Sequence, residues 1–360
     1  MASSGINFTN LTPDNGAVRD LKQLIFLSVL GEEQLGSMFN VLPNQKHGDK
    51  VGLIGEFGLL GKASEGCDPT YDHNVIATTE KEWDIREWQI SEEICYKDLE
   101  GTLAQVALKT KSNIADLTGT EYLDYVIMPR LEVAVRKMLM RFAWFGDKEA
   151  NVAASGGVLK DGTRVGAFTV TDGVFKRAFA LAAANSARHT TIAANAKTTF
   201  AEQKSAIRTE GAATDVLDNL ISDAPQELRQ AEGQVIFISQ ALKDALNADI
   251  KKNNRGADLT WEATFDGITK TNYDGIELVA IPFWDEIIKG YETAASGKAW
   301  NKPYRAIYTV RDNLLLGFEG ENEIADLQVF FSQKDQKTYI LAKDKMGSLI
   351  ADENLIQVAF

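Results

Sequence analysis

Three histidines are the side chains of this sequence best suited to general-base or metal-ligand chemistry at neutral pH: His47, His73 and His189. They are far apart in sequence, so there is no local zinc motif, although ligation over a longer range stays open. A Ser-His-Asp or Cys-His site would have to use one of the three. His47 and His73 lie in polar loop sequence and His189 follows an alanine-rich run. We expect all three to be structural or exposed.

A glycine-rich run at residues 55–64 contains a Gly-Lys pair, as phosphate-binding loops do. That motif needs a glycine where this chain has Glu56, and a magnesium-ligating Ser or Thr where it has Ala63. The Glu56 carboxylate would repel phosphate. We interpret the run as part of a flexible hairpin arm. No Gly-x-Gly-x-x-Gly pattern follows a predicted strand, so a dinucleotide site of that kind is also excluded.

The remaining candidates for chemistry are equally weak. Paired carboxylates such as Glu319 and Glu321 are expected by chance among 51 acidic residues, and are more typical of solvated faces. The cysteines Cys67 and Cys95 suit a reducing compartment and lack metal-ligand spacing. The sequence therefore predicts no enzyme, no cofactor and no metal site.

Composition indicates an ordinary globular protein. With 360 residues, 44% of them hydrophobic, the chain is long enough for about two domains. No apolar run approaches the ~18 residues of a membrane helix, and we predict no signal peptide, which indicates a cytoplasmic protein. The net charge of −13 disfavours a dedicated nucleic-acid binder, but contact with packed DNA through one local basic face stays compatible with it.

Residues 1–16 predict a polar extended arm, and residues 50–90 predict a protruding hairpin. The second strand-like run of this hairpin carries Trp83, Ile85, Trp88 and Ile90, and its spacing changes from two to three after Ile85. Such a change predicts a bulge or sharp twist. Two tryptophans on an arm with little core of its own predict contact with another protein surface. In the alternative, both tryptophans pack onto their own domain.

Residues 121–145 have the strongest helical pattern, with apolar residues at spacings of three and four. Pro129 lies inside this pattern, so the helix either kinks or begins there, and Gly146 ends it. Four basic residues take the other positions: Arg130, Arg136, Lys137 and Arg141. They predict either a solvated positive face or a face that meets acidic groups of a neighbouring subunit.

The rest of the chain mixes helices and strands without regular βαβ alternation or internal repeats, which predicts an α+β fold. Residues 178–207 predict one or two helices. Residues 234–239 predict a buried strand, after which Ser239 caps a helix over 240–252. Further strands are expected at 275–281 (stopped by Pro282), 305–318, 327–341 (with a turn at 334–336) and 347–358.

This order of elements resembles the tailed-bacteriophage major capsid proteins, which have the HK97-like fold. The resemblance is strongest from Gly233 to the end of the sequence. Five segments carry it: residues 234–244, 273–282, 303–309, 312–314 and 326–358. They are similar to the family's strand and following helix, its turn, strand and proline step, its next strand pair and its closing sheet.

The resemblance implies an N-terminal arm (1–48), an extended loop (49–90), a peripheral domain with a long spine helix (91–149 and 323–360) and an axial domain (150–322). It implies self-assembly as hexamers and pentamers into an icosahedral phage head around double-stranded DNA. The extended loop would lie over a neighbour's long helix. That contact would make six residues part of the subunit interface: Trp83, Trp88, Arg130, Arg136, Lys137 and Arg141.

Further partners follow from the same resemblance. The short arm leaves no room for a fused scaffolding segment, so we expect a separate scaffolding protein, a portal, possible decoration proteins and weak, non-specific contact with packaged DNA. The protein would reside in the virion after assembly in the bacterial host cytoplasm, without membrane contact, and no crosslinking pair is predicted. The alternatives are an encapsulin-like nanocompartment shell, another phage structural protein of the tail or adaptor, and an enzyme using scattered carboxylates or His189.

Overall fold

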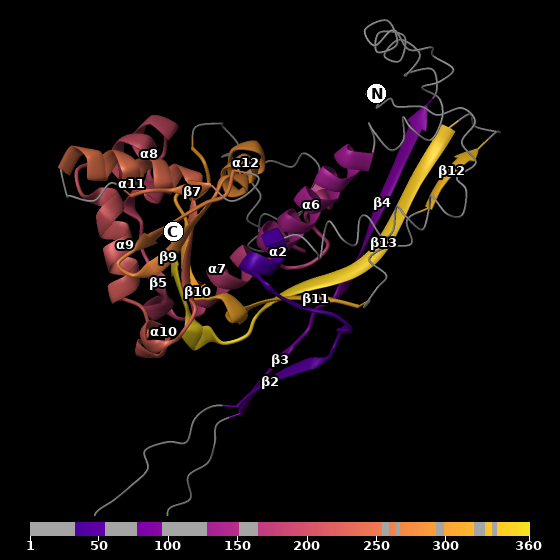
Figure 1. The fold of residues 1–360 in the computed structure, drawn as a ribbon, viewed down its shortest axis with the longest axis horizontal. Coiled ribbons are helices and arrows are strands. Elements are labelled where there is room, and N and C mark those ends of the chain that lie inside the picture. The colour runs from indigo at the N-terminus through magenta and orange to yellow at the C-terminus, as the bar shows by residue number, and fades with distance from the viewer. Residues whose placement is uncertain are drawn as a thin grey trace, which may run out of the picture.

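The computed structural model describes residues 33–54, 78–95, 128–150, 165–253, 259–263, 267–292, 299–319, 328–332 and 337–360. Within these residues the chain forms two large sheets, one separate strand pair and helices packed against the sheets (Figure 1). The predicted α+β class is confirmed. None of the described helices is long and apolar enough to cross a membrane.

The larger sheet has seven strands in the order β5-β14-β10-β6-β9-β8-β7. These are β5 (His189–Thr190), β14 (Ile356–Ala359), β10 (Ala306–Val310), β6 (Gln234–Ser239), β9 (Ile276–Ile281), β8 (Thr269–Tyr273) and β7 (Glu262–Ala263). Its central strands are almost wholly apolar because both faces are covered. Val235 and Phe237 of β6 belong to one buried cluster, and Ile236 and Ile238 to the other, as strand alternation requires.

The helices divide between the two faces of this sheet. On the face of Ile236 the buried cluster includes residues of α8 (Phe200–Ile207), α9 (Ala212–Ser222), α10 (Gln226–Gln230) and α11 (Gln240–Asn253). On the face of Val235 it includes residues of α6 (Met128–Phe145), α7 (Val174–Ala184) and α12 (Pro282–Tyr291). As predicted, Ser239 caps α11, since its Oγ accepts the Leu242 N–H at 3.4 Å. Pro282 ends β9 and begins α12.

The smaller sheet is organised around one long strand, β13 (Lys337–Ile350). It pairs with β12 (Gln328–Ser332) and β11 (Leu314–Phe318) along one edge and with β4 (Arg86–Cys95) along the other. Next to β11 lies β1 (Asn40–Leu42), which follows α2 (Glu33–Met38). The antiparallel β12–β13 pair confirms the predicted hairpin, whose turn at 334–336 lies outside the described residues.

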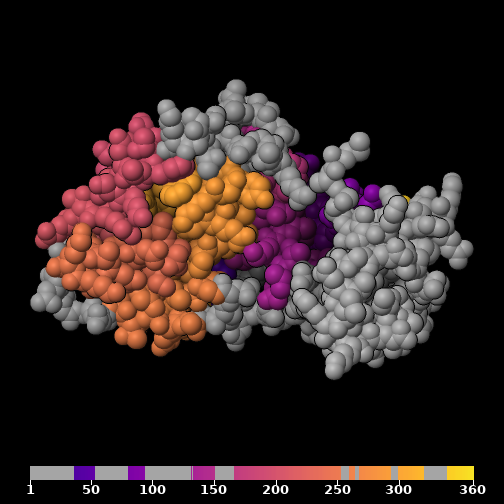
Figure 2. Space-filling model, turned by 90° about the horizontal axis from the view of Figure 1, so that it is seen from above, coloured from indigo at the N-terminus to yellow at the C-terminus, as the bar shows by residue number. Residues whose placement is uncertain are grey.

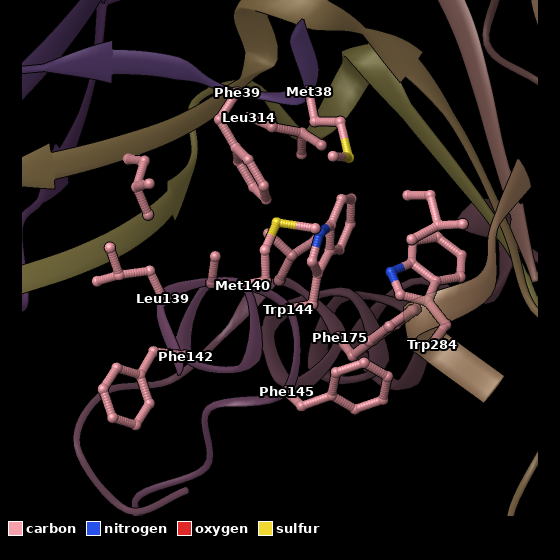
Figure 3. Close-up of a cluster of buried hydrophobic side chains, with 14 of the residues drawn as sticks. Met38, Phe39, Leu139, Met140, Phe142, Trp144, Phe145, Phe175, Trp284 and Leu314 are labelled. Carbon is pink, nitrogen blue, oxygen red and sulfur yellow. The ribbon is translucent and has the colours of Figure 1, made fainter. Parts of the chain in front are cut away.

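The helix α6 connects the two sheets through its last turns. Trp144 is fully buried, and its ring centroid lies 4.8 Å from that of Phe39, beside β1, and 5.6 Å from that of Phe237 in β6. Trp284 of α12 and Phe175 of α7 complete this aromatic group, at 4.8 and 5.7 Å from Trp144 (Figure 3). One continuous core therefore contacts both sheets.

The ends of α6 match only part of the sequence prediction. Pro129 is the second residue of the described helix, and the choice between a beginning and a kink there depends on residues before Met128, outside the described part of the chain. The predicted residues 121–127 lie outside the described residues. At the other end, the Gly146 N–H bonds to the Phe142 carbonyl at 3.2 Å, and a Cβ there would lie 2.2 Å from the Thr171 carbonyl oxygen. Gly146 thus ends the helix where the backbone approach is too close for a side chain.

The separate strand pair is a hairpin of β2 (Lys50–Ile54) and β3 (Thr78–Glu82), which projects away from both sheets in Figure 1. Of the predicted bulge or sharp twist between Ile85 and Trp88, a bulge is not found, because the pairing of β4 with β13 is continuous from Arg86 onward. Residues 83–85 instead carry the chain from β3, which pairs with β2, to β4, which pairs with β13. The spacing change therefore marks a passage between sheets.

Strand membership cuts across the predicted domain segments. Within the predicted peripheral segment 323–360, β12 and β13 lie in the smaller sheet but β14 lies in the larger one. Within the predicted axial segment 150–322, β11 lies in the smaller sheet. Seen from above in Figure 2, the red and orange residues gather at one end, and the magenta residues reach the surface beside lighter orange ones.

Candidate subunit interface

The two tryptophans predicted at a subunit interface are buried inside their own subunit. Trp83 is 0% exposed and clusters with Ile85, Leu315 and Leu349. Trp88 is 2% exposed and belongs to the main core cluster with the inner residues of α6. This placement agrees with the alternative stated above, in which both tryptophans pack onto their own domain. Neither indole presents a face that a neighbour could contact, so the expectation for these two residues is corrected.

Two basic residues of α6, Arg141 and Lys137, make contacts within the subunit. Arg141 donates from Nε to the Ala167 carbonyl at 2.9 Å, and its guanidinium lies over the Phe168 ring. Lys137 forms an exposed ion pair with Glu286 of α12 at 3.0 Å. Arg136 is half-buried, and the Arg130 side chain lies outside the described part of the chain. The three described side chains, Arg136, Lys137 and Arg141, differ in burial and contacts, and the interface role of all four basic residues stays a prediction.

Among the described side chains of α6, the exposed ones form a short strip. Val133 is 43% exposed, which is unusual for a large apolar side chain here, and Ala134 and Lys137 are exposed next to it. Residues three and four apart lie on one face of a helix, so these three form a continuous surface. A single exposed valine is too small a patch to define a docking site on its own.

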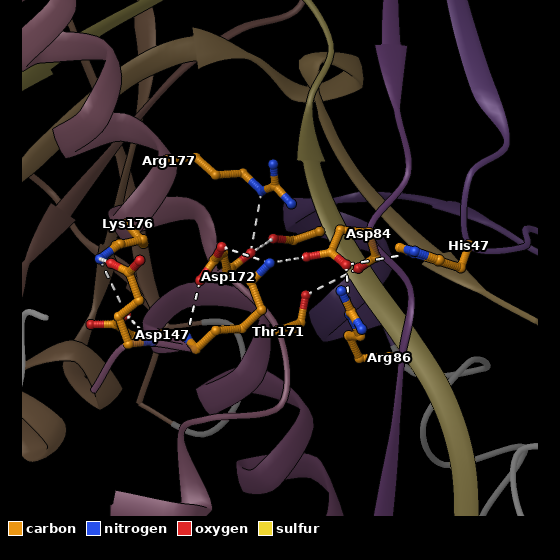
Figure 4. Close-up of polar contacts among 11 residues, drawn as sticks. His47, Asp84, Arg86, Asp147, Thr171, Asp172, Lys176 and Arg177 are labelled. Atoms are coloured by element: carbon orange, nitrogen blue, oxygen red, sulfur yellow. Dashed lines mark hydrogen bonds and ion pairs between the residues drawn. The ribbon is translucent and has the colours of Figure 1, made fainter. Parts of the chain in front are cut away.

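A polar network surrounds Asp84, at the point where the hairpin joins the body (Figure 4). Its carboxylate accepts the Arg86 Nε–H at 2.7 Å, pairs with Lys148, and lies 3.5 Å from Nδ1 of His47. Burial alone would raise the pKa of the Asp84 carboxyl, but hydrogen bonds from Lys148 and Arg86 outweigh it and hold that pKa below its ordinary value. Asp84 is therefore a carboxylate at neutral pH.

Lys148 connects this network to the turn before α7. Its ammonium lies 3.2 Å from Asp172, whose backbone carbonyl accepts the Arg177 Nε–H at 3.2 Å. Burial would lower the pKa of Lys148, but the bonds and charges of Asp84 and Asp172 hold it above its ordinary value. Burial lowers the pKa of Arg177, against the charges of Asp172 and Asp84. These ion pairs join segments that are remote in sequence.

Two glycines, paired across the smaller sheet, make room for the hairpin base. Gly317 of β11 and Gly347 of β13 are register partners. A Cβ on Gly317 would lie 2.9 Å from Cζ3 of Trp83, and one on Gly347 would lie 2.7 Å from the Asp84 backbone oxygen. A Cβ at either position would force the Trp83 ring or the Asp84 backbone to shift, so both positions favour glycine. We call this pair the glycine notch.

The histidines and acidic groups singled out in the sequence are not gathered into a metal site within the described residues. The described part of the chain contains no group of His, Cys, Asp and Glu that could hold a metal. His189 stacks on the Phe360 ring with centroids 4.0 Å apart, and its Nε2 lies 3.3 Å from the Phe360 carbonyl, which is a structural role. His47 is exposed beside Asp84, and His73 lies outside the described residues.

Comparison with solved structures shows which class of protein has this fold. A chain of the satellite phage P4 procapsid including size determination (Sid) protein is 13% identical, with a TM-score of 0.50, over 95% of this chain and 98% of that one. A chain of Gordonia phage Cozz is also 13% identical, with a TM-score of 0.50, over 91% and 86%. The chain therefore has the fold of phage capsid proteins, as the sequence predicted.

A chain of the holo-SrpI encapsulin complex from Synechococcus elongatus PCC 7942 is similar as well, at 9% identity and a TM-score of 0.47, over 98% of this chain and 91% of that one. This TM-score is too low to support an argument about function. No protein-family model matches the chain, and no curated protein does. The likeness of structures at low identity shows the fold alone.

Proposed function

We propose that this protein is a structural major capsid protein that assembles as hexamers and pentamers into an icosahedral phage head enclosing double-stranded DNA. The observation that supports this function is the shared fold, which extends over nearly the whole of this chain and of the P4 procapsid chain. A fold shared end to end suits a protein whose shape is its function. An end-to-end match is less typical of enzymes that share a domain but catalyse different reactions.

The proposal assigns the projecting hairpin and the outer side of α6 to subunit contacts. The hairpin of one subunit would lie over α6 of its neighbour. There Lys137 is the most exposed of the described basic candidates, and Val133 supplies an apolar contact beside it. Arg130, Arg136 and Arg141 remain candidates for the same interface. Many such contacts, each weak, would together hold the shell against the pressure of packaged DNA.

The predicted segments and partners enter the same proposal. Residues 1–48 would act as an arm, 49–90 as the extended loop, 91–149 with 323–360 as the peripheral domain, and 150–322 as the axial domain. A separate scaffolding protein, a portal and decoration proteins would take part in assembly in the host cytoplasm. The net charge of −13 suits a container that contacts DNA only weakly.

The test is the assembly state of the purified full-length chain. Dynamic light scattering and negative-stain microscopy of one sample should show closed shells, or free hexamers and pentamers that close when scaffolding protein is added. A monomer that persists at high concentration with scaffolding protein present would contradict self-assembly. Open rings or tubes would indicate a tail or adaptor protein, and shells filled with protein instead of DNA in infected cells would indicate a nanocompartment.

A further inference from the structure

We infer that residues 83–85 act as a clamp that fixes the direction of the β2–β3 hairpin within a single subunit, before any neighbour binds. The clamp lies where the chain leaves the hairpin and crosses the glycine notch. Its parts belong to one chain, so the inference holds whether or not the proposed shell forms.

The first part of the clamp is the Trp83 ring on Gly317. The indole is fully buried, and its atoms occupy the space that a side chain at position 317 would fill. Leu315 and Leu349, from the two strands of the notch, belong to the same buried cluster. The ring therefore acts as an apolar anchor that the hairpin base cannot leave without exposing a cavity in the sheet.

The second part is the Asp84 backbone on Gly347. The Asp84 carbonyl passes close over the Gly347 Cα and accepts a hydrogen bond from Thr171 Oγ1 at 3.3 Å. The Asp84 carboxylate is held at the same time by Arg86 and Lys148. The backbone at this position is thus fixed by the smaller sheet on one side and by the segments flanking α7 and α6 on the other.

The third part connects the clamp to the hairpin. The Trp83 N–H donates to the Asp49 carbonyl at 2.8 Å, and the Gly48 N–H donates to the Trp83 carbonyl at 2.9 Å. Further bonds tie both ends of the hairpin to the body: Gln45 N–H to the Phe318 carbonyl at 2.8 Å, and an ion pair of Lys81 with Glu353. Because these bonds continue directly into the β2–β3 ladder, a fixed base fixes the direction of the strands.

The test compares hydrogen exchange of full-length Gly317→Ala with that of the native protein. Both proteins are measured in the same assembly state. The new methyl group displaces the Trp83 ring, so amide exchange at residues 48–54 and 78–85 should accelerate about tenfold or more, while β6 and β9 keep their native rates. Gly52→Ala is the matched control. It lies within the hairpin itself, where a Cβ meets no atom within 4 Å, and it should leave exchange at the clamp unchanged.

A double variant identifies Trp83 as the cause. In Trp83→Leu with Gly317→Ala, the smaller side chain makes room for the methyl group, so adding Gly317→Ala should accelerate exchange much less than it does in the native background. Native exchange rates in the hairpin of Gly317→Ala would overturn the clamp, as would equal acceleration by Gly52→Ala. If Gly317→Ala does not fold, hydrogen exchange of Trp83→Leu is compared with that of the native protein instead. The clamp predicts faster exchange at residues 48–54 in Trp83→Leu, and unchanged rates there would refute it.

Discussion

The side chain of Asn313 forms two hydrogen bonds with the backbone of Asp352. Its Oδ1 accepts the Asp352 N–H at 2.6 Å, and its Nδ2 donates to the Asp352 carbonyl at 2.9 Å. The same Nδ2 also donates to the Leu355 carbonyl at 3.0 Å. Asn313 lies between β10 and β11, and residues 351–355 lie between β13 and β14. One buried amide thus joins the two places where the chain crosses from one sheet to the other.

We therefore predict that Asn313→Ala lowers the free energy of unfolding by roughly 2–4 kcal/mol, because three part-buried backbone groups lose their partner at once. Asn313 is only 3% exposed, so water cannot replace these bonds without rearrangement. Chemical denaturation measures the change. The nearby exposed Asn354, changed to Ala, should cost about 0.5 kcal/mol or less. Equal effects of the two substitutions would contradict the assigned role.

Asp249 should be a second large contributor to stability, because it caps α9 from another helix. Its carboxylate accepts the Gly211 N–H at 2.7 Å, the Thr214 N–H at 3.2 Å and the Thr214 hydroxyl at 2.7 Å. Asp249→Ala leaves these donors buried without an acceptor and should cost about 2–3 kcal/mol. Asp249→Asn keeps one acceptor oxygen and should cost less. Thermal unfolding of the two variants gives the order, and an equal loss in both would contradict the capping role.

The Asp84 network predicts a contribution to stability that disappears in acid. The pKa of Asp84 is held below its ordinary value, so its carboxylate stabilises the folded state above the unfolded pKa of about 3.9, and this contribution is lost as the pH falls through the folded value. The charged and titratable groups around it are Arg86, Lys148, His47, Asp172 and Arg177.

Asp84→Asn isolates this contribution from the other carboxylates. The difference in unfolding free energy between the native chain and Asp84→Asn should be constant from pH 7 to about 5 and should shrink as the pH falls below about 4. Denaturant titrations across this range measure it. A difference that stays the same down to pH 3 would show that Asp84 is not stabilised as a carboxylate.

Substitutions at Lys137 distinguish a contact with a neighbouring subunit from a contact within the subunit. Its exposed ion pair with Glu286 should contribute less than about 1 kcal/mol to stability, so Lys137→Glu should leave folding almost unchanged. If Lys137 meets acidic groups of a neighbouring subunit, this change should reduce particle formation in light scattering.

The charge-swapped pair Lys137→Glu with Glu286→Lys is the control for that experiment. It restores the ion pair within the subunit but keeps the negative charge at position 137. Continued loss of assembly in the double variant supports a role toward the neighbour. Recovery of assembly would show that Lys137 acts only through Glu286.

Much of the larger sheet could be predicted from local pattern. The apolar run at residues 234–239 and the strand ending at Pro282 are buried on both faces, so their composition alone identifies them. The cap at Ser239 and the end of α6 at Gly146 follow from local residue preferences. Such features depend on residues close in sequence.

The environment of Trp83 could not be predicted in the same way. Alternation shows that one face of a strand is apolar, but not what packs against that face. A residue buried in its own subunit and a residue that docks on a neighbour therefore have the same pattern. The glycine notch brings together positions 317 and 347, and the Asp84 network joins residues 47, 84, 148 and 172. The signal in the sequence that could have indicated this packing is the isolated glycines Gly317 and Gly347 inside two strand-like runs. Such glycines often mark a close approach of another backbone segment.

The position of β14 has a consequence for synthesis of the chain. This strand comes near the end of the sequence, yet it lies between β5 and β10 inside the larger sheet. While the ribosome is still translating, β10 can pair with β6, but its other edge stays open and β5 has no strand to join. The nascent polypeptide therefore carries an unpaired, apolar edge until residues 356–359 emerge, and during that interval it is open to aggregation or chaperone capture.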